Sequence, residues 1–300
     1  RGEVMKSGFV SIVGRPNVGK STLLNAIIGK KIAITSSTAQ TTRNMIQGIY
    51  HGDDVQIIFV DTPGIHKPHN KLGQVLNKQA YYNLSDVDVI LFLVDVTEKL
   101  GNGDKFILEK LKENDVPVIL VLNKMDKITY LELLPKIEEY KDLYPFQAII
   151  PVSAYKKKNL EDLIETVSQY LRDDVPYYDE DTFTNVSEKF SVAELIREKV
   201  LYHTKEEVPH SVTCITEEIS EDKSSIRVIA SLIVDRENLK KILIGKNGAM
   251  IKRIGMEARH DIEKLLEKKV YLDLRVRVVP NWRDKESFLR ELGYEDISLD

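Results

Sequence analysis

The stretch Gly14-Arg-Pro-Asn-Val-Gly-Lys-Ser21 follows an apolar run, Phe9 to Gly14, and precedes a segment with helical spacing, Ser21 to Ile28. A G-x4-G-K-S loop between a strand and a helix is typical of phosphate-binding sites. Glycines let the backbone wrap around phosphates, while amides and the helix N-terminus supply positive potential. We therefore expect Lys20 to reach terminal phosphates and Ser21 to ligate magnesium, within a nucleotide-binding set of Gly14, Asn17, Val18, Gly19, Lys20, Ser21 and Thr22.

The first half of the chain alternates between strand-like and helix-like segments. Short runs rich in Val, Ile and Leu predict further strands at 55–61, 89–95, 117–123 and 147–153, and amphipathic stretches predict helices at 72–85, 103–114 and 160–171. This alternation predicts an α/β fold with a mostly parallel sheet covered by helices on both faces. Ligands of such sheets bind beyond the carboxyl ends of the strands.

Polar motifs stand at three of these predicted strand ends. In Asp61-Thr-Pro-Gly64, the carboxylate can hold magnesium through water and the Gly64 amide can meet the terminal phosphate. In Asn123-Lys124-Met125-Asp126, the Asp126 carboxylate can accept hydrogen bonds from the ring N–H and the exocyclic amine of guanine. Adenine offers neither donor at those positions, so this carboxylate selects guanine.

A third motif, Val152-Ser153-Ala154, offers backbone donors to the guanine carbonyl. Together the motifs predict a site for GTP and GDP that includes Asp61, Gly64, Asn123, Lys124, Asp126, Ser153 and Ala154.

Over about residues 6–171, this motif set resembles the P-loop GTPases related to translation factors. The resemblance implies hydrolysis of GTP to GDP and phosphate with Mg²⁺ as cofactor. It also places Gln40-Thr41-Thr42-Arg43 at the first switch, where a family threonine binds magnesium when GTP is present. Thr42 is the favoured residue and Thr41 the alternative. The metal set is then Ser21, Thr42 and Asp61, and the catalytic set is Lys20, Thr42, Gly64 and Asn17.

Two positions near the phosphates bear on turnover. Ile65 stands where many signalling GTPases carry a glutamine that orients the attacking water, so we expect slow intrinsic turnover that depends on outside factors. Asn17 resembles the asparagine with which some related GTPases bind potassium, which makes K⁺ a second cofactor candidate. A turn-stabilising role for Asn17 is an equal alternative.

The second half has a different order of elements. Residues 172–185 contain Pro176, adjacent tyrosines and five acidic residues, which predicts an exposed linker. Beyond it, hydrophobic spacing predicts a helix at 187–203, strands at 212–219 and 225–234, helices at 238–244 and 249–268, and a strand at 270–279. We expect a GTPase domain at 5–171, a linker at 172–186, an α+β domain at 187–285 and a tail at 286–300, with the two domains folding separately.

Gly245-Lys-Asn-Gly248 lies between two of the predicted helices. With the order α-β-β-α-α-β, this loop resembles that of a type II KH domain, which implies binding of single-stranded RNA. A Cβ at these glycines would hold a phosphate backbone away. From 236 to 285 there are 14 Lys and Arg against 7 Asp and Glu, a local charge of roughly +7 in a chain of net charge −4. The expected RNA-binding residues are Ile244, Gly245, Lys246, Asn247, Gly248 and Lys252.

The two halves in this order resemble the Era family of bacterial ribosome-assembly GTPases. The resemblance implies binding near the 3′ end of small-subunit ribosomal RNA and a role in small-subunit maturation under nucleotide control. It also implies a cytoplasmic protein that associates reversibly with the inner face of the membrane. Trp282-Arg283 matches the ending of the family, although an apolar anchor is a sufficient role for the tryptophan. The alternative is a membrane-associated signalling GTPase whose C-terminal domain binds protein or lipid.

Composition sets wider limits. Of the 300 residues, 42% are hydrophobic and 30% charged, which is typical of a folded protein with a hydrated surface. Cys214 is the single cysteine, so no intramolecular disulfide can form, and no Cys/His cluster suggests a structural metal site. No run of eighteen apolar residues predicts a membrane span. We expect a monomer.

Overall fold

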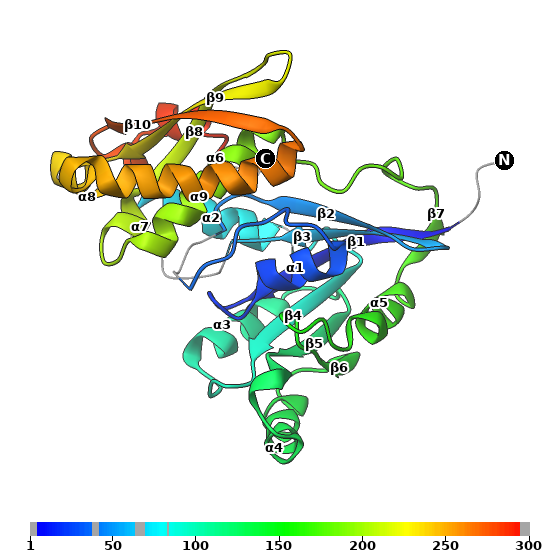
Figure 1. The fold of residues 1–300 in the computed structure, drawn as a ribbon. Coiled ribbons are helices and arrows are strands. Elements are labelled where there is room, and N and C mark those ends of the chain that lie inside the picture. The colour runs from blue at the N-terminus through cyan, green and yellow to red at the C-terminus, as the bar shows by residue number, and fades with distance from the viewer. Residues whose placement is uncertain (1–4, 38–41, 64–69, 83, 295–300) are drawn as a thin grey trace.

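The computed structural model describes residues 5–37, 42–63, 70–82 and 84–294, which form two domains (Figure 1). The N-terminal domain, for which the sequence predicts GTPase activity and which is called the GTPase domain below, runs from blue to green in Figure 1. The C-terminal domain, from green to red, lies against it. Among the helices of the described residues, none is long and apolar enough to cross a membrane.

The GTPase domain is built on a seven-stranded sheet in the order β2-β3-β1-β4-β5-β6, with β7 paired to the start of β1. Strands β1, β3, β4, β5 and β6 are parallel, whereas β2 and β7 are antiparallel to their neighbours. The predicted mostly parallel α/β fold is confirmed. The strands are β1 (Met5–Gly14), β2 (Ile46–His51), β3 (Val55–Asp61), β4 (Val89–Asp95), β5 (Val118–Asn123), β6 (Ala148–Pro151) and β7 (Arg172–Asp174).

Both faces of this sheet are buried because alternate residues of each strand enter opposite cores. On β4, Leu91 and Leu93 pack with α1 (Lys20–Ile28) and α5 (Leu160–Ser168). Their neighbours, such as Phe92, pack with helices on the other face, namely α2 (Lys71–Tyr82), α3 (Asn102–Leu111) and α4 (Tyr130–Lys141).

The register of the sheet brings the polar motifs to one edge. Ile12 of β1 lies beside Asp61 of β3, two residues before Gly14 begins the phosphate-binding loop. On the other side, Asp95 of β4 lies beside Asn123 of β5. Because these parallel strands end together, motifs that are far apart in sequence surround one site.

Within residues 5–171, one strand and one α-helix were not expected from the sequence. Strand β2 has Gln47 and Gly48 among its apolar residues, so it lacks the continuous hydrophobic run of the central strands. Helix α4 contains Pro135, a residue that argues against a helix, yet Thr129 and Glu132 form a capping box at its start. A proline in the second turn of a helix is tolerated when tertiary packing, here of Leu133 and Tyr140, holds the helix in place.

The C-terminal domain has the predicted order α-β-β-α-α-β, with a short extra helix, α7 (Val208–Ser211), before its first strand. Its sheet has the order β10-β9-β8, with β9 parallel to β10 and antiparallel to β8. Helices α6 and α9 pack on this sheet around a separate apolar core. The other elements are α6 (Glu188–His203), β8 (Thr213–Glu221), β9 (Ser225–Val234), α8 (Glu237–Ile244), α9 (Ala249–Leu266) and β10 (Lys269–Val278).

The segment predicted as an exposed linker is attached to the GTPase domain along its length. Residues Arg172–Asp174 form β7, and the Phe183 carbonyl accepts a hydrogen bond from the Ile49 amide at 3.0 Å. Between them, the Gln56 side-chain carbonyl accepts from the amides of Tyr177 and Tyr178 at 2.7 and 3.0 Å. The polar composition correctly indicated a surface position, but this segment satisfies its backbone groups against the edge of a sheet.

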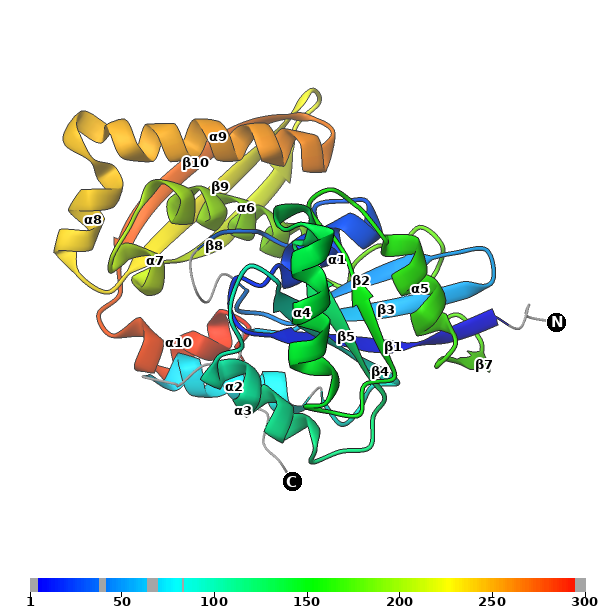
Figure 2. The same cartoon turned by 90° about the horizontal axis from the view of Figure 1, so that it is seen from below.

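A third apolar core, which the sequence did not predict, joins the two domains. Helix α2 of the GTPase domain shares a buried apolar cluster with the end of the chain, in which Leu72 and Leu76 pack with Trp282, Leu289 and Tyr294. Part of the predicted tail forms α10 (Glu286–Glu291), which lies beside α2 (Figure 2). The domains thus have their own cores and a third core between them, because the apolar face of α2 is covered from outside its own domain.

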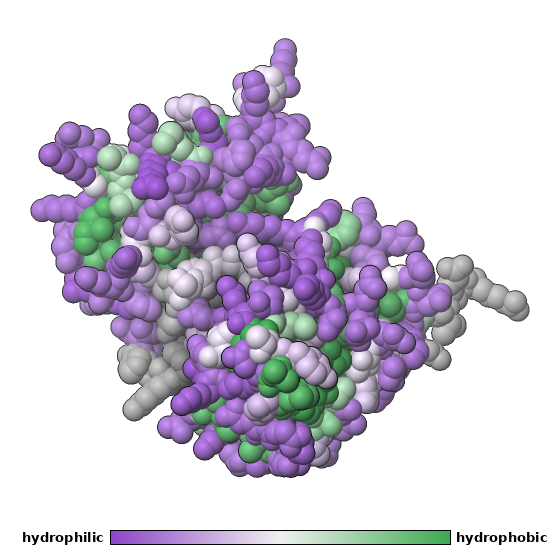
Figure 3. Space-filling model, turned by 60° about the horizontal axis from the view of Figure 1, so that its bottom comes forward, coloured by the Kyte–Doolittle hydropathy of each residue, from purple (hydrophilic) through white to green (hydrophobic). Residues whose placement is uncertain are grey.

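The surface is mainly hydrophilic, with smaller apolar patches on the face shown in Figure 3. Helix α4 carries exposed apolar side chains, among them Tyr130, Leu131 and Leu134. Exposed apolar residues are common on soluble proteins, so this helix face alone indicates no partner.

Candidate nucleotide and nucleic-acid sites

The phosphate-binding loop closes around the side chain of Lys20. This residue is buried, and its Nζ donates to the carbonyls of Gly14 at 3.2 Å and Arg15 at 2.8 Å. Burial lowers the pKa of Lys20 to about 8, while Asp61 acts in the opposite direction. A phosphate beside this ammonium would favour its charged form, which makes the loop a receptor for anions.

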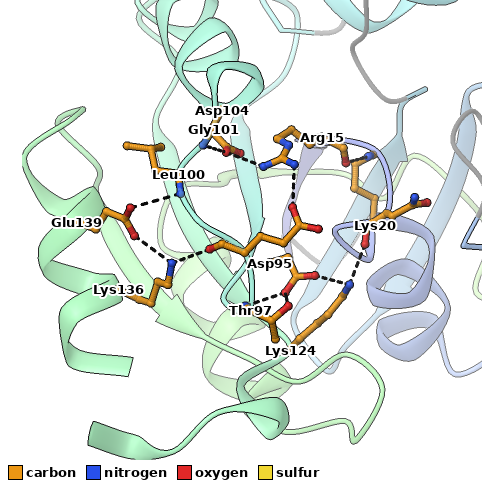
Figure 4. Close-up of polar contacts among 12 residues, drawn as sticks. Arg15, Lys20, Asp95, Thr97, Leu100, Gly101, Asp104, Lys124, Lys136 and Glu139 are labelled. Carbon is orange, nitrogen blue, oxygen red and sulfur yellow. Dashed lines mark hydrogen bonds and ion pairs between the residues drawn. The ribbon is translucent and has the colours of Figure 1, made fainter. Parts of the chain in front are cut away.

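The fold fixes this loop from behind. Arg15 donates to Asp104 Oδ2 at 3.0 Å and to Glu98 Oε2 at 2.7 Å, which ties the loop to the segment around the start of α3 (Figure 4). Gly19 has φ of +105°, and a Cβ there would overlap the side-chain amide of Asn123. Glycine is therefore required at this position both by the backbone conformation and by close packing.

Three oxygen-bearing side chains meet beside Lys20. Ser21 Oγ lies 2.7 Å from Asp61 Oδ2 and 2.8 Å from Thr42 Oγ1, and Thr42 Oγ1 lies 3.4 Å from Asp61 Oδ2. Asp61 is buried, and its Oδ1 has no hydrogen-bond partner among the described residues. Burial raises the pKa of Asp61 to about 6, which its contacts with Ser21, Lys20 and Thr42 oppose.

This cluster fits a hard divalent cation. Mg²⁺ prefers oxygen ligands, and a buried carboxylate with an unsatisfied oxygen is stabilised in its charged form by a nearby cation. Of the two switch threonines considered, Thr42 lies at this cluster. Thr41, Gly64 and Ile65 lie outside the described residues, so the roles predicted for them stay predictions.

The motif at the end of β5 connects the phosphate-binding loop to the opposite side of the site. Asn123 is buried, with its Nδ2 donating to the Val18 carbonyl at 2.9 Å and its Oδ1 accepting from the Ala154 amide at 3.0 Å. Asp126 Oδ1 accepts from Ser153 Oγ at 2.6 Å, and this hydrogen bond lowers the pKa of Asp126. The Asp126 carboxylate is therefore ionised and oriented, as a receptor for two guanine N–H groups requires.

Lys124 and Ala154 refine the predicted guanine site. Lys124 Nζ donates to Asp95 Oδ2 at 2.5 Å and to the Asn17 carbonyl at 2.9 Å, so its side chain extends across the site (Figure 4). The Ala154 amide, predicted to meet the guanine carbonyl, donates to Asn123 in this structure. That predicted contact remains untested.

Exchange of Asp126 for asparagine tests the guanine assignment. We expect Asp126→Asn to weaken GTP binding about 100-fold or more and to favour xanthosine triphosphate, because the amide can donate to the xanthine carbonyl that replaces the guanine amine. Competition between the two nucleotides measures the change. Glu165→Gln, which alters an exposed carboxylate on α5, serves as the control. Unchanged preference for guanine in Asp126→Asn would contradict the assignment.

A cavity of about 510 Å³ lies over the phosphate-binding loop. The structure brings seven of the predicted residues to its wall, namely Asn17, Gly19, Lys20, Ser21, Thr22, Thr42 and Lys124. It is also lined by residues that the sequence analysis did not identify, Ile34 to Ser37 and Tyr202. The first group precedes the switch motif and could have been found from that position. Tyr202 belongs to the C-terminal domain, and no local sequence signal places it here.

Asn17 lies at the rim of this cavity. Its backbone has φ of 66°, a conformation in which asparagine is common, and its Nδ2 donates to the Ser37 carbonyl at 2.8 Å. The contact joins the phosphate-binding loop to the segment that leads into the switch. It is compatible both with the turn-stabilising role and with a cation site.

The second predicted site, Gly245 to Gly248, forms the connection between α8 and α9. Gly245, Asn247 and Gly248 all have positive φ, of 73°, 51° and 76°. Lys246 and Asn247 are exposed at the tip, whereas Ile244 is partly buried beneath it. The loop thus presents backbone and a lysine to solvent at the start of a long helix, an arrangement that suits contact with phosphates.

A groove of about 300 Å³ lies between α9 and β10, beside this loop. Lys252 and Arg259 from α9 line one side, and Tyr271 and Leu274 from β10 line the other. Tyr271 is 67% exposed, so its ring is available for stacking. Apolar and aromatic surface next to cations is the combination that unstacked bases require.

Comparison with known proteins agrees with these two sites. The 50S ribosome-binding GTPase family matches residues 9–124, and the KH domain family matches residues 207–283. A crystal structure of a variant of Era from Aquifex aeolicus bound to GDP·AlF4⁻ is 42% identical, with a TM-score of 0.93. A structure of Era in complex with MgGDPNP and nucleotides 1506–1542 of 16S ribosomal RNA has the same identity and TM-score. Each alignment covers 97% of this chain and 99% of the other. The chain therefore belongs to the Era family and is an enzyme that hydrolyses GTP to GDP and phosphate.

Proposed function

We propose that this GTPase binds the 3′ end of small-subunit ribosomal RNA through its KH domain and assists maturation of the small subunit under the control of its nucleotide. The main observation in support is the pairing, in one chain, of a buried oxygen cluster beside the phosphate-binding loop with a cationic groove beside Gly245 to Gly248. The relative solved with MgGDPNP is in complex with nucleotides 1506–1542 of 16S ribosomal RNA, which supports this choice of RNA.

The RNA assignment is tested with an oligonucleotide of the 16S 3′ end. Its affinity is measured with GDP and with a non-hydrolysable GTP analogue, each over a range of salt concentrations. Binding that weakens as salt rises and differs between the two nucleotides is the expected result, since phosphate contacts release counterions. Binding to lipid vesicles without affinity for the RNA would favour the alternative, a membrane-associated signalling GTPase.

Hydrolysis requires charge stabilisation at the terminal phosphate. Ser21, Thr42 and Asp61 would hold Mg²⁺, which neutralises charge on the phosphates when bound. Lys20 lies beside this cluster with its Nζ turned to the loop carbonyls, from where it can reach the phosphates.

We propose K⁺ as a second cofactor, bound at Asn17. The position of Asn17 on the wall of the nucleotide cavity supports this, because its side-chain amide carries an oxygen besides the nitrogen that donates to the Ser37 carbonyl. We expect hydrolysis to be roughly tenfold faster in potassium chloride than in sodium chloride at equal ionic strength, as an added positive charge near the phosphates would produce. Asn17→Ala should remove this difference and leave GDP binding intact. Equal rates of the unaltered protein in both salts would refute the potassium site.

We also propose that the protein is a cytoplasmic monomer that contacts the inner face of the membrane reversibly. The family resemblance supports this proposal. Light scattering of the purified protein measures its mass, and co-sedimentation with anionic vesicles measures membrane contact. A stable dimer, or the absence of any vesicle binding at low salt, would contradict the corresponding part.

A further inference from the structure

The C-terminal domain holds the segment of the first switch at both of its described ends. Before residues 38–41, the amide of Thr35 donates to Glu198 Oε1 of α6 at 3.0 Å. After them, the guanidinium of Arg43 enters the C-terminal domain, where Nη1 donates to the Val212 carbonyl at 2.6 Å and Nη2 to the Pro209 carbonyl at 3.1 Å. Both contacts connect the wall of the nucleotide cavity to the RNA-binding domain.

Arg43 is an unusual residue to bury. Only 1% of its surface is exposed, no ion pair joins it to a carboxylate of the described residues, and its Nε has no hydrogen-bond partner among them. The Trp282 ring lies 5.8 Å from the guanidinium carbon. Burial, together with the nearby charge of Arg197, lowers the pKa of Arg43 to about 10. A desolvated cation held by two carbonyls and a ring contributes little to stability, because desolvation opposes those contacts.

The position of Arg43 in the chain connects this buried cation to the magnesium cluster. It follows Thr42, whose hydroxyl lies 2.8 Å from Ser21 Oγ at the magnesium cluster. Adjacent Cα atoms are separated by about 3.8 Å and cannot move far apart. Any movement of the C-terminal domain that carries Arg43 with it must therefore disturb the Thr42 hydroxyl.

Glu198 anchors the other end in a network of charges. It is 8% exposed at its side chain, and its Oε2 accepts from Lys31 at 2.5 Å and from Lys199 at 3.2 Å. Lys31 and Lys199 also approach Asp261 of α9, at 3.5 and 2.5 Å. Tyr202 lies four residues after Glu198, on the same face of α6, and reaches the cavity wall. One face of α6 thus lies beside the segment that precedes the first switch.

We propose that Arg43 and Glu198 are positioning residues for Thr42, through which docking of the KH domain holds that threonine at the magnesium site. Binding of a magnesium–triphosphate complex and docking of the domain then reinforce each other, since a coupling between two sites acts equally in both directions. This inference rests on the proposed nucleotide control of the enzyme and names the contacts that carry it.

The first test separates this role from a general loss of stability. The variants are Arg43→Met, which removes the guanidinium at similar volume, and Glu198→Gln, which is closely isosteric. We expect each to weaken binding of a fluorescent GTP analogue about tenfold at limiting Mg²⁺ and to raise the Mg²⁺ concentration needed for half-maximal binding. Affinity for GDP should stay unchanged, since the family threonine binds magnesium with GTP.

Two further variants sharpen this test. Arg43→Lys should weaken binding of the analogue as Arg43→Met does, because one ammonium cannot replace a planar group that donates to two carbonyls. Glu286→Gln removes an exposed ion pair to Lys71 elsewhere between the domains and should leave both affinities unchanged. Equal affinity losses for GDP and the analogue in Arg43→Met and Glu198→Gln, or no loss for either nucleotide, would overturn the proposal.

The second test observes docking without measuring nucleotide binding or activity. The bond between Arg43 and Asn44 is a trypsin site, and the buried position of Arg43 should protect it. We expect cleavage at this bond, followed by mass spectrometry, to be faster in Glu198→Gln than in the unaltered protein. In the unaltered protein, the GTP analogue with Mg²⁺ should slow cleavage at this bond. Cleavage that is independent of both the variant and the analogue would show that docking is not coupled to the nucleotide.

Failure of this inference differs from failure of the proposed function. If the unaltered protein binds the 16S oligonucleotide in a nucleotide-dependent way but the variants behave like it, the coupling runs through other contacts, such as α2 and Trp282. If the unaltered protein shows no nucleotide-dependent RNA binding at all, the proposed function itself is wrong, whatever the variants show.

Discussion

Lys20→Ala is expected to reduce GTP turnover by at least about 100-fold. The Lys20 ammonium is the buried cation beside the magnesium cluster, and its removal leaves the terminal phosphate without that charge. Phosphoryl transfer depends on positioning and charge stabilisation, so binding of the triphosphate should weaken along with turnover. Single-turnover hydrolysis and equilibrium binding of a GTP analogue measure the two effects.

The protein should remain folded when Lys20 is replaced, because the substitution removes a charge that burial disfavours. RNA binding in the absence of nucleotide should persist, since the groove between α9 and β10 is made by the other domain. Lys105→Ala, on the exposed side of α3, removes a lysine of the same domain and serves as the control. Turnover in Lys20→Ala that stays within a few-fold of the control would disprove the role given to this lysine.

Aspartate at both Gly245 and Gly248 is expected to weaken binding of the 16S oligonucleotide by about 100-fold or more, the range in which charged hydrogen-bond partners act. Each new carboxylate repels a phosphate, and each new side chain keeps the RNA backbone at a distance. Basal GTP hydrolysis should survive, because the loop lies at the outer end of α9, away from the GTPase domain (Figure 1). Any stimulation of hydrolysis by RNA should be lost.

The two glycines differ in a way that allows a matched control. A Cβ at Gly245 would come within 2.7 Å of Met250 Cβ and 2.9 Å of the Met250 amide nitrogen, so any side chain there distorts the loop. A Cβ at Gly248 meets no atom within 4 Å, and its φ of 76° is tolerated by Asn and Asp. Gly248→Asn therefore reproduces the shape of Gly248→Asp without its charge. If Gly248→Asp and Gly248→Asn both bind the RNA as tightly as the unaltered protein does, the RNA does not contact this loop.

Much of the nucleotide site could be predicted from the sequence because its signals are local. The spacing from Gly14 to Ser21 specifies a loop that only glycines allow, and the apolar strand before it predicts where that loop lies in the sheet. Asp61 and Asn123 could be placed together because parallel strands end at one edge. Local signals also identified the second domain. The predicted order of helices and strands, with Gly245 and Gly248 between two helices, indicated a KH domain.

Elements with conflicting local signals were harder to predict. Pro135 argues against a helix at the position of α4, although the sequence also contains the capping box of Thr129 and Glu132. The polar composition of residues 172–185 correctly indicated a surface segment but gave no sign that the segment would pair with the sheet. In both cases packing against neighbouring elements outweighed the local preference.

By itself, the sequence determined the two fold classes, the guanine nucleotide and the place of the magnesium cluster, because each depends on short-range spacing and on strand ends. Only the tertiary structure decided how the domains meet. Arg43 in a pocket of backbone carbonyls, Glu198 at the Thr35 amide and Tyr202 at the cavity wall join segments that are far apart in the chain. A carbonyl acceptor belongs to every residue type, so a contact made to the backbone leaves no mark in the sequence of the partner.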